Sequence, residues 1–259
     1  MAGRLVVVGA GGRMGQRIMA LAKETSGLRL VGAVDVSTHP SQGTEVASGV
    51  TLSDEFPETA DIVIDFSLPE GTDKTLTFCA AHDAALVLGT TGLTESQKVA
   101  LNTLSQQVPV VQATNMSVGM NTLFATVGKI ARMLGDDYDV EIVEQHHRFK
   151  KDAPSGTALS LAESICEDTD RDLGQSLVHG REGKDALRHK GDIGMHAVRA
   201  GDIVGIHSVI YSTQGETITI NHTAHSRDTF VGGALRAAQW LPGQAPGLYS
   251  MRDVLGIES

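Results

Sequence analysis

The fold of this chain is decided by residues 5–15, which read LVVVGAGGRMG. Four apolar residues predict a short strand that runs into a glycine-rich turn, and a helix is predicted from about Gln16. Because glycine has no Cβ, backbone amides and the helix N-terminus can approach a pyrophosphate closely. The spacing departs from G-x-G-x-x-G, since Met14 follows three after Gly11 and the third glycine comes at Gly15. Such turns also occur for packing alone, so a second signal is needed.

Asp35 is that second signal. It ends the second predicted strand, 20 residues after Gly15, where a carboxylate accepts hydrogen bonds from an adenosine ribose. Without the glycine turn, the better interpretation would be a solvated acid at a strand end. The next residue is Val36 and not Arg, so no guanidinium stands beside Asp35 to neutralise a 2′-phosphate. Arg13, or a residue of the turn at residues 37–39, could take that role.

Short apolar runs alternate with helical stretches from residue 5 to about residue 111. Runs rich in Val, Ile and Leu without polar alternation are typical of a parallel sheet covered on both faces. The predicted strands are residues 5–8, 28–34, 61–66, 84–88 and 108–111, and the predicted helices are residues 15–23, 70–81 and 95–106. This order predicts an α/β fold with a doubly wound, Rossmann-like sheet.

Small polar loops follow two later strands of this series. They hold Gly89, Thr90 and Thr91 in one case and Ala113, Thr114, Asn115 and Met116 in the other. Ligands of open parallel sheets lie outside the carboxyl ends of the strands, so we expect both loops to line the nicotinamide half of the site. Taken alone, each loop is an ordinary turn.

The pattern changes after Met120. Apolar residues recur at helical spacing over residues 123–134, and residues 138–142, 203–212 and 216–224 read as strands that can pair antiparallel. These segments predict a second, α+β domain. Residues 230–240 are again helical, and we expect them to return to the first domain.

Composition excludes several partners. The formal charge of −10, from 31 acidic and 21 basic residues among 259, argues against nucleic acid or an anionic membrane as the main partner. No run approaches the ~20 apolar residues of a membrane span, and residues 5–8 are too few for a signal-peptide core. Cys79 and Cys166 lack metal-site or disulfide spacing and predict reduced, packed thiols. We therefore expect a cytoplasmic protein that holds any anionic ligand with a local basic cluster.

That basic cluster lies in residues 144–158, which read EQHHRFKKDAPSGTA. Two imidazoles and three permanent cations stand within six residues, and a helix start follows, with free N–H groups and a positive dipole end. Metal binding by His146 and His147 is disfavoured because adjacent histidines diverge and no HExxH pattern is present. A solvated basic loop is the other alternative, but the cofactor domain before it and the helix after it favour an anion site.

Together these motifs resemble the 4-hydroxy-tetrahydrodipicolinate reductase (dihydrodipicolinate reductase) family. The matching segments are residues 9–15, 65–67, 89–92, 115–119, 144–158 and 198–202, so the resemblance covers essentially the whole chain. The most specific of them is HHRxKxDAPSGT at residues 146–157.

The resemblance implies a cofactor domain made of residues 1–118 and 228–259, and a substrate-binding and tetramerisation domain made of residues 119–227. It implies a homotetramer that reduces 4-hydroxy-tetrahydrodipicolinate, a small dicarboxylate, via dihydrodipicolinate to tetrahydrodipicolinate in the diaminopimelate route of lysine biosynthesis. NADH or NADPH would supply the hydride.

Residue roles carry over in the same way. His146 would be the proton donor and acceptor and Lys150 a proton donor. The substrate would be bound by His147, Ser155, Gly156 and Thr157, with Arg148 nearby. The cofactor would be bound by Gly9, Ala10, Gly11, Gly12, Arg13, Met14, Asp35, Gly89, Thr90, Thr91, Ala113, Thr114, Asn115 and Met116. No metal is implied.

Two departures from the family pattern are visible. Phe149 stands where some members have His, and Val36 stands where some have Arg, so we expect NADH to be used at least as well as NADPH. Two rival functions remain. Another two-domain NAD(P)-dependent dehydrogenase, acting on homoserine or a sugar phosphate, would not need residues 146–157. A non-catalytic dinucleotide-sensing regulator would need a DNA-binding or partner surface that this acidic chain does not offer.

Overall fold

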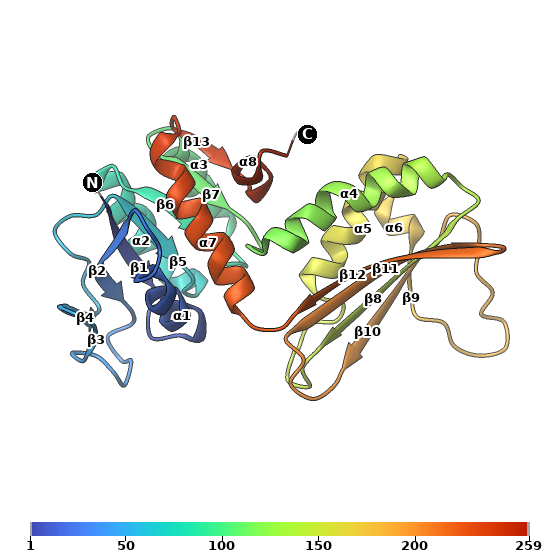
Figure 1. Ribbon diagram of the computed structural model, residues 1–259, viewed down its shortest axis with the longest axis horizontal. Coiled ribbons are helices and arrows are strands. Elements are labelled where there is room, and N and C mark those ends of the chain that lie inside the picture. The colour runs from blue at the N-terminus through green and yellow to red at the C-terminus, as the bar shows by residue number, and fades with distance from the viewer. Residues whose placement is uncertain (1, 258–259) are drawn as a thin grey trace. The chain divides into compact units, whose positions relative to one another are not determined.

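The computed structural model describes residues 2–257, and the chain divides into two compact units (Figure 1). Unit 1 comprises the described parts of Met1–Val118 and Arg227–Ser259, and unit 2 comprises Gly119–Ser226. No helix of the described chain is long and apolar enough to cross a membrane.

Unit 1 is built on an eight-stranded sheet in the order β13-β7-β6-β5-β1-β2-β4-β3. All neighbours pair in parallel except β3 and β4. The strands are β1 (Gly3–Val8), β2 (Leu28–Val34), β3 (Glu45–Ala47), β4 (Val50–Ser53), β5 (Ile62–Asp65), β6 (Ala85–Leu88), β7 (Pro109–Gln112) and β13 (Gly247–Tyr249). The order turns at β1, which places the carboxyl end of β1 at the topological switch point where such sheets bind ligands.

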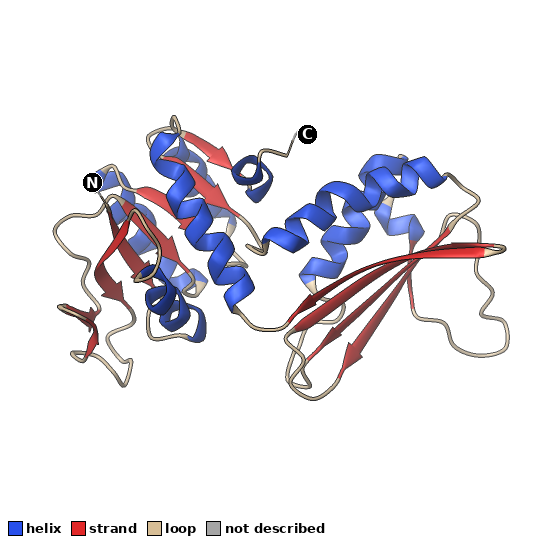
Figure 2. Cartoon of the chain, viewed as in Figure 1, coloured by secondary structure: helices blue, strands red, loops and turns tan. Residues whose placement is uncertain are grey.

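Helices cover both faces of this sheet (Figure 2). Leu5 and Val7 of β1 pack into one apolar cluster with α1 (Arg13–Ala22), α7 (Asp228–Trp240) and α8 (Met251–Leu255). Val6 and Val8 point the other way, into a cluster with α2 (Pro69–His82) and α3 (Glu95–Ser105). Both faces of the central strands are therefore buried, as their unbroken apolar sequence predicts, and the predicted α/β class is confirmed.

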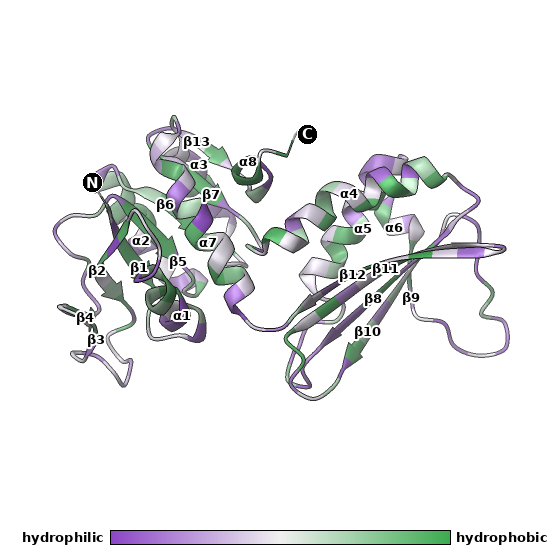
Figure 3. Ribbon diagram, in the orientation of Figure 1, coloured by the Kyte–Doolittle hydropathy of each residue, from purple (hydrophilic) through white to green (hydrophobic). Residues whose placement is uncertain are grey.

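The C-terminal segment completes unit 1. Helix α7 packs against α1, the 3₁₀ turn η1 (Leu241–Gly243) follows, and β13 adds an edge strand to β7. A Cβ on Gly233 would lie 1.6 Å from the backbone oxygen of Met116, so α7 can pack this closely only because residue 233 is glycine. Helix α7 alternates hydrophobic and hydrophilic residues, as an amphipathic helix on a sheet should (Figure 3).

Unit 2 is a mixed five-stranded sheet in the order β12-β11-β8-β10-β9, with helices on one face (Figure 2). Its strands are β8 (Asp139–His146), β9 (Leu177–His179), β10 (Ile193–Arg199), β11 (Gly205–Thr213) and β12 (Glu216–Ala224), and its helices are α4 (Val118–Leu134), α5 (Gly156–Thr169) and α6 (Leu173–Ser176). Inward residues of β8 and β11, such as Ile142 and Tyr211, pack under α4 and α5.

The structure corrects three sequence predictions. Helix α1 begins at Arg13 and not near Gln16, because Gly12 already accepts a helical hydrogen bond from the amide of Gln16. Antiparallel pairing in unit 2 holds for β8, β11 and β12, but β9 and β10 run parallel to β8. The strands β3, β4, β9, β10 and β13 were not predicted.

Candidate active site

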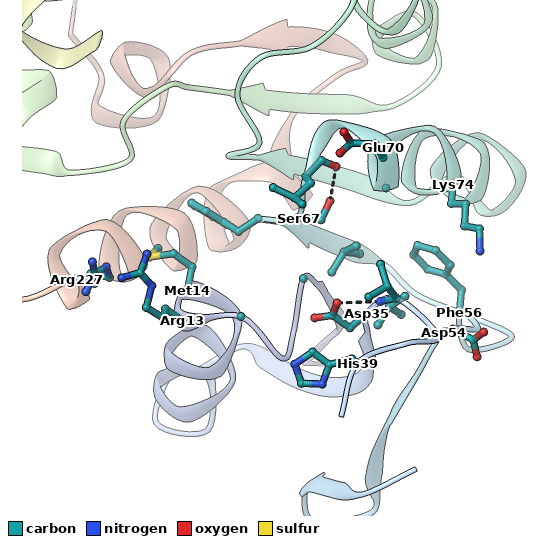
Figure 4. Close-up of a pocket in the computed structure, with 18 residues that line it drawn as sticks. Arg13, Met14, Asp35, His39, Asp54, Phe56, Ser67, Glu70, Lys74 and Arg227 are labelled. Carbon is teal, nitrogen blue, oxygen red and sulfur yellow. Dashed lines mark hydrogen bonds between the residues drawn. The ribbon is translucent and has the colours of Figure 1, made fainter. Parts of the chain in front are cut away.

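A cavity of about 600 Å³ opens at the carboxyl end of β1 in unit 1 (Figure 4). It is lined by Gly9, Gly12, Arg13 and Met14 of the glycine turn and by Asp35 at the end of β2. The remaining lining residues are Val8, Val34, Val36, His39, Asp54, Phe56, Phe66, Ser67, Leu68, Glu70, Gly71, Lys74 and Arg227. The predicted turn and strand-end acid therefore meet at one cavity.

Two glycines of the turn are required by the backbone. Gly9 has a φ of +73°, and a Cβ there would lie 2.6 Å from the backbone oxygen of Phe66. A Cβ on Gly15 would lie 2.2 Å from the backbone oxygen of Gly9. Gly15 thus provides the close contact between helix and turn that the third glycine of a dinucleotide fingerprint provides, despite its shifted position.

Asp35 is held in place by backbone donors. The amide of Gly11 donates to Oδ2 and the amide of Val36 donates to Oδ1, each at 2.8 Å. Each carboxylate oxygen retains acceptor capacity for a ribose hydroxyl, since a carboxylate can accept about four hydrogen bonds. The Asp35 carboxylate can therefore accept further hydrogen bonds, and the valine that follows it is exposed.

His39, in the turn at residues 37–39, lies against the glycine turn. Its ring is so close that a Cβ on Gly11 would lie 2.4 Å from its Nε2. Its Nδ1 accepts a hydrogen bond from the amide of Ser41 at 3.1 Å. The neutral ring therefore carries its proton on Nε2, the nitrogen beside the turn.

Two arginines form a basic wall of the same cavity. Arg13 opens α1 and Arg227 precedes α7, and Figure 4 shows them side by side. Burial, and then repulsion by Arg13, lower the pKa of Arg227. Within residues 2–257, neither guanidinium forms an ion pair with a carboxylate. Arg227 had no signal in the sequence, because it is distant along the chain from the turn that it joins.

The two later loops do not line this cavity. Thr90 is buried, and its hydroxyl donates to Asp65 Oδ1 at 3.0 Å. A Cβ on Gly89 would lie 2.4 Å from the ring of Phe66, and Met116 is buried in the core below α7. Asn115 accepts a hydrogen bond from the amide of Ser117. The side chains of Thr90 and Met116 thus serve the packing of unit 1, and Thr91 and Thr114 are exposed.

Unit 2 contains a second candidate cluster, around His146 at the end of β8. Its Nδ1 lies 2.6 Å from Oε2 of Glu144, which is completely buried. Burial would raise the pKa of Glu144, but hydrogen bonds from His146 and Arg199 outweigh it and hold the pKa at about 2. A buried carboxylate, ionised at neutral pH, therefore faces one nitrogen of the imidazole.

The neighbouring strands complete the surroundings of His146. His207 on β11 is 4% exposed, and its ring stands edge-on to that of His146 at a centroid distance of 5.1 Å. Burial lowers the pKa of His207 to about 3, so His207 is neutral at physiological pH. Its Nε2 lies 3.3 Å from the hydroxyl of Ser155.

The helix start predicted after residue 154 is present. Ser155 is the N-cap of α5, and its hydroxyl accepts from the amide of Ala158 at 3.2 Å. Gly156 and Thr157 form the first turn, and a Cβ on Gly156 would meet no atom within 4 Å. The structure thus places open space at the positive end of this helix.

Lys150 is close to this helix start in sequence. Its Nζ pairs with Asp152 at 2.9 Å, and its side chain is 23% exposed. His147 is half-buried, while Arg148 and Phe149 are exposed. Among the described residues, no group of three or more His, Cys, Asp or Glu side chains could hold a metal ion, and Cys79 and Cys166 are free and buried.

Comparisons with known proteins agree across both units. Residues 3–116 match the model of the dihydrodipicolinate reductase N-terminus, and residues 119–255 match that of the C-terminus. Named relatives include 4-hydroxy-tetrahydrodipicolinate reductases of Syntrophotalea carbinolica, 44% identical over 98% of this chain and 99% of the relative, and of Hahella chejuensis, 46% identical over 98% and 99%.

Solved structures share the fold. A dipicolinate-bound dihydrodipicolinate reductase from Paenisporosarcina sp. TG-14 has a TM-score of 0.77 at 21% identity and covers 96% of this chain and 98% of its own. GenD2 from gentamicin A biosynthesis, in complex with NAD, has a TM-score of 0.62 at 12% identity over 99% and 91%. The two family models together cover residues 3–255 except residues 117 and 118, so the chain belongs to the dihydrodipicolinate reductase family.

Proposed function

We propose that this protein reduces 4-hydroxy-tetrahydrodipicolinate, via dihydrodipicolinate, to tetrahydrodipicolinate with a nicotinamide cofactor, in the diaminopimelate route of lysine biosynthesis. The observation that carries this proposal is the imidazole of His146, fixed by a buried carboxylate at the start of the segment that leads into α5. The family and the names of the relatives support the same reaction.

The residues of unit 1 fit a dinucleotide. A Cβ at position 9 or 15 would collide with backbone, so this turn can form only with glycine at both positions. In this turn the amides at the start of α1 can approach a pyrophosphate. We assign the pyrophosphate to the turn at residues 9–14, with Arg13 and Arg227 as its cations, and the adenosine ribose to Asp35. We assign the loops at residues 89–91 and 113–116 to the nicotinamide end, through their backbone and exposed side chains. The bound cofactor supplies a hydride.

His146 supplies the proton in this proposal. The substrate first loses its hydroxyl group as water, which gives dihydrodipicolinate. Hydride addition to this unsaturated imine then leaves an enamine that must be protonated. Because Glu144 engages Nδ1, Nε2 is the nitrogen that exchanges a proton with the substrate. An imidazole that is fixed in this way can act as a general acid and then recover its proton.

The substrate carboxylates need cationic and amide partners. We assign one carboxylate to the first turn of α5, where the amides of Gly156 and Thr157 and the Thr157 hydroxyl can donate charge-assisted hydrogen bonds. Lys150 would exchange its pairing with exposed Asp152 for the anionic substrate and would act as a proton donor. His147 and Ser155 would contact the same ligand.

We also propose a homotetramer that acts in the cytoplasm. Only one face of the unit 2 sheet is covered by helices of the described chain, and the other carries Val143, Ile206 and Ile210 between polar neighbours. A second copy would cover those side chains. Two free, buried thiols suit a reducing compartment.

We expect pyridine-2,6-dicarboxylate to inhibit competitively against the substrate, because this planar molecule carries the same two carboxylates. Thr157→Val should raise its inhibition constant about tenfold or more, since a hydrogen bond to a charged group is worth about 1.5–3 kcal/mol. Thr169→Val, at the opposite end of α5, is the matched control. Steady-state kinetics test this, and either non-competitive inhibition or equal effects of the two variants would contradict the assigned pocket.

The second expectation concerns the cofactor. Asp35 repels a 2′-phosphate and Val36 offers no charge, so kcat/KM with NADH should at least equal that with NADPH. Val36→Arg should raise the NADPH to NADH ratio of kcat/KM about tenfold, and added salt should reduce this gain. Val99→Arg is a matched control, because Val99 is 65% exposed and Val36 is 60% exposed. A natural protein that strongly prefers NADPH would show that the adenosine end is misassigned.

A further inference from the structure

We propose that Glu144 and Arg199 are positioning residues that fix the tautomer and orientation of His146 and couple it to the start of α5. This inference rests on the proposed function, because it names the device that prepares His146 for proton transfer. The resemblance to the family assigned a role to neither residue.

The contact with His146 determines which nitrogen reacts. An ionised carboxylate can only accept, so the 2.6 Å contact between Glu144 Oε2 and His146 Nδ1 requires a proton on Nδ1 in both the neutral and the charged ring. The proton that is exchanged with the substrate must then be on Nε2. Among residues 2–257, no group hydrogen-bonds Nε2, and glycine at position 205 keeps its surroundings open, since a Cβ there would lie 3.2 Å from it.

Arg199 fixes the carboxylate itself. Its Nη1 donates to Oε2 at 2.8 Å and its Nη2 donates to Oε1 at 2.7 Å, a bidentate pair across the parallel strands β8 and β10. Nη2 also donates to the backbone oxygen of Asp152 at 2.7 Å. The planar guanidinium therefore prevents rotation of the Glu144 carboxylate and attaches it to the loop that carries Lys150.

The second carboxylate oxygen of Glu144 accepts a hydrogen bond from the start of α5, the helix end that we assign to a substrate carboxylate. The backbone amide of Ser155, the N-cap of α5, donates to Oε1 at 3.0 Å. One buried carboxylate thus receives His146 and Arg199 on one oxygen, and Arg199 and Ser155 on the other. The proton-transfer imidazole and the helix start are held by the same group, so a shift of one would displace the other.

A purely structural ion pair is the competing interpretation, and the chain contains a matched example. Glu141, three residues earlier on β8, lies 2.6 Å from Nε2 of His196 and pairs with Arg181 at 2.9 Å. The same residue types thus form a second Glu–His–Arg cluster on the opposite face of the strand. Side chains separated by an odd number of residues along a strand point to opposite faces. Glu141 touches none of the residues assigned to substrate.

The kinetic experiment compares Glu144→Gln with Glu141→Gln in the full-length protein. We expect Glu144→Gln to lower kcat about 10²-fold with less than a threefold change in the KM for cofactor, and Glu141→Gln, in the oligomeric state of the natural protein, to leave both within twofold. Because Glu144 acts through His146, the double variant Glu144→Gln/His146→Gln should have the kcat of His146→Gln alone. Equal losses in the two single variants, or additive losses in the double variant, would overturn the proposal.

A spectroscopic readout separates this proposal from the proposed function. In ¹⁵N-histidine-labelled protein, the resonances lost in His146→Gln identify His146, and we expect the Nδ1–H tautomer in the natural protein and a mixture in Glu144→Gln. An unchanged tautomer would overturn the positioning role even if the protein is an active reductase. The expected tautomer change in a protein without reductase activity would reject only the proposed function. If Glu144→Gln does not fold, Arg199→Lys, which keeps the charge but loses the bidentate contact, should show the same tautomer mixing.

Discussion

His146→Gln should lower kcat by about 10²- to 10⁴-fold while leaving the dissociation constant of the cofactor within a few-fold. The physical reason is that glutamine has no group that can donate a proton and recover it near neutral pH. Stopped-flow or steady-state oxidation of NADH with synthase-generated substrate measures kcat, and fluorescence titration measures cofactor binding. A folded variant with near-normal turnover would contradict the assignment of His146 as the proton donor.

Lys150→Ala should lower kcat over the same range, since it removes the cation that pairs with Asp152 at 2.9 Å and that we assign to the anionic substrate. The adjacent Lys151 provides the control, because it is exposed and has no assigned role. Lys151→Ala should keep turnover within about twofold. A similar loss in both variants would mean that general charge on the loop matters and that Lys150 has no specific role.

Gly15→Ala should abolish measurable cofactor binding, raising the dissociation constant by about 100-fold or more, and should lower the free energy of unfolding by about 1–3 kcal/mol. The added Cβ would lie 2.2 Å from the Gly9 oxygen and 2.5 Å from the Ala10 Cα, and both are backbone atoms that cannot rotate away. Helix α1 must therefore move off the turn whose amides we assign to the pyrophosphate.

Gly232→Ala is the control for this substitution. Gly232 is an exposed helical residue on α7, and a Cβ there would meet no atom within 4 Å, so alanine should be neutral or slightly stabilising. Calorimetric titration with NADH and urea unfolding measure the two effects. Tight cofactor binding by Gly15→Ala would show that this turn is not the pyrophosphate site.

Local sequence signals were sufficient for most of unit 1. The apolar runs at residues 5–8 and 28–34 are the central strands of the sheet, and the helix predicted from residue 95 begins there, after a capping box formed by Thr94 and Gln97. Strands of three residues such as β13 escape notice, because Gly247–Tyr249 is too short to show any periodicity and is defined only by pairing with β7.

Long-range pairing limited the prediction of the active site. His146, Lys150 and Ser155 could be chosen from one contiguous segment, but Arg199 lies 55 residues beyond Glu144 and meets it only because β10 pairs in parallel with β8. The strand that carries Arg199 was not among those predicted from the sequence, so nothing placed Arg199 beside Glu144. Arg227 was missed for the same reason, since it belongs to no motif and reaches the cavity only through the fold.

The discontinuous composition of unit 1 has a consequence for synthesis on the ribosome. Val231 and Ala234 of α7 belong to the apolar cluster that covers Leu5 and Val7, and β13 protects the edge of β7. These parts emerge only after Gly119–Ser226 has been translated, which at about 5–20 residues per second takes several seconds. During that interval the nascent chain exposes an apolar sheet face and an unpaired strand edge, the two features that invite aggregation. Unit 2 has an apolar core of its own and does not wait for this segment, so only unit 1 remains incomplete until α7 and β13 have been translated.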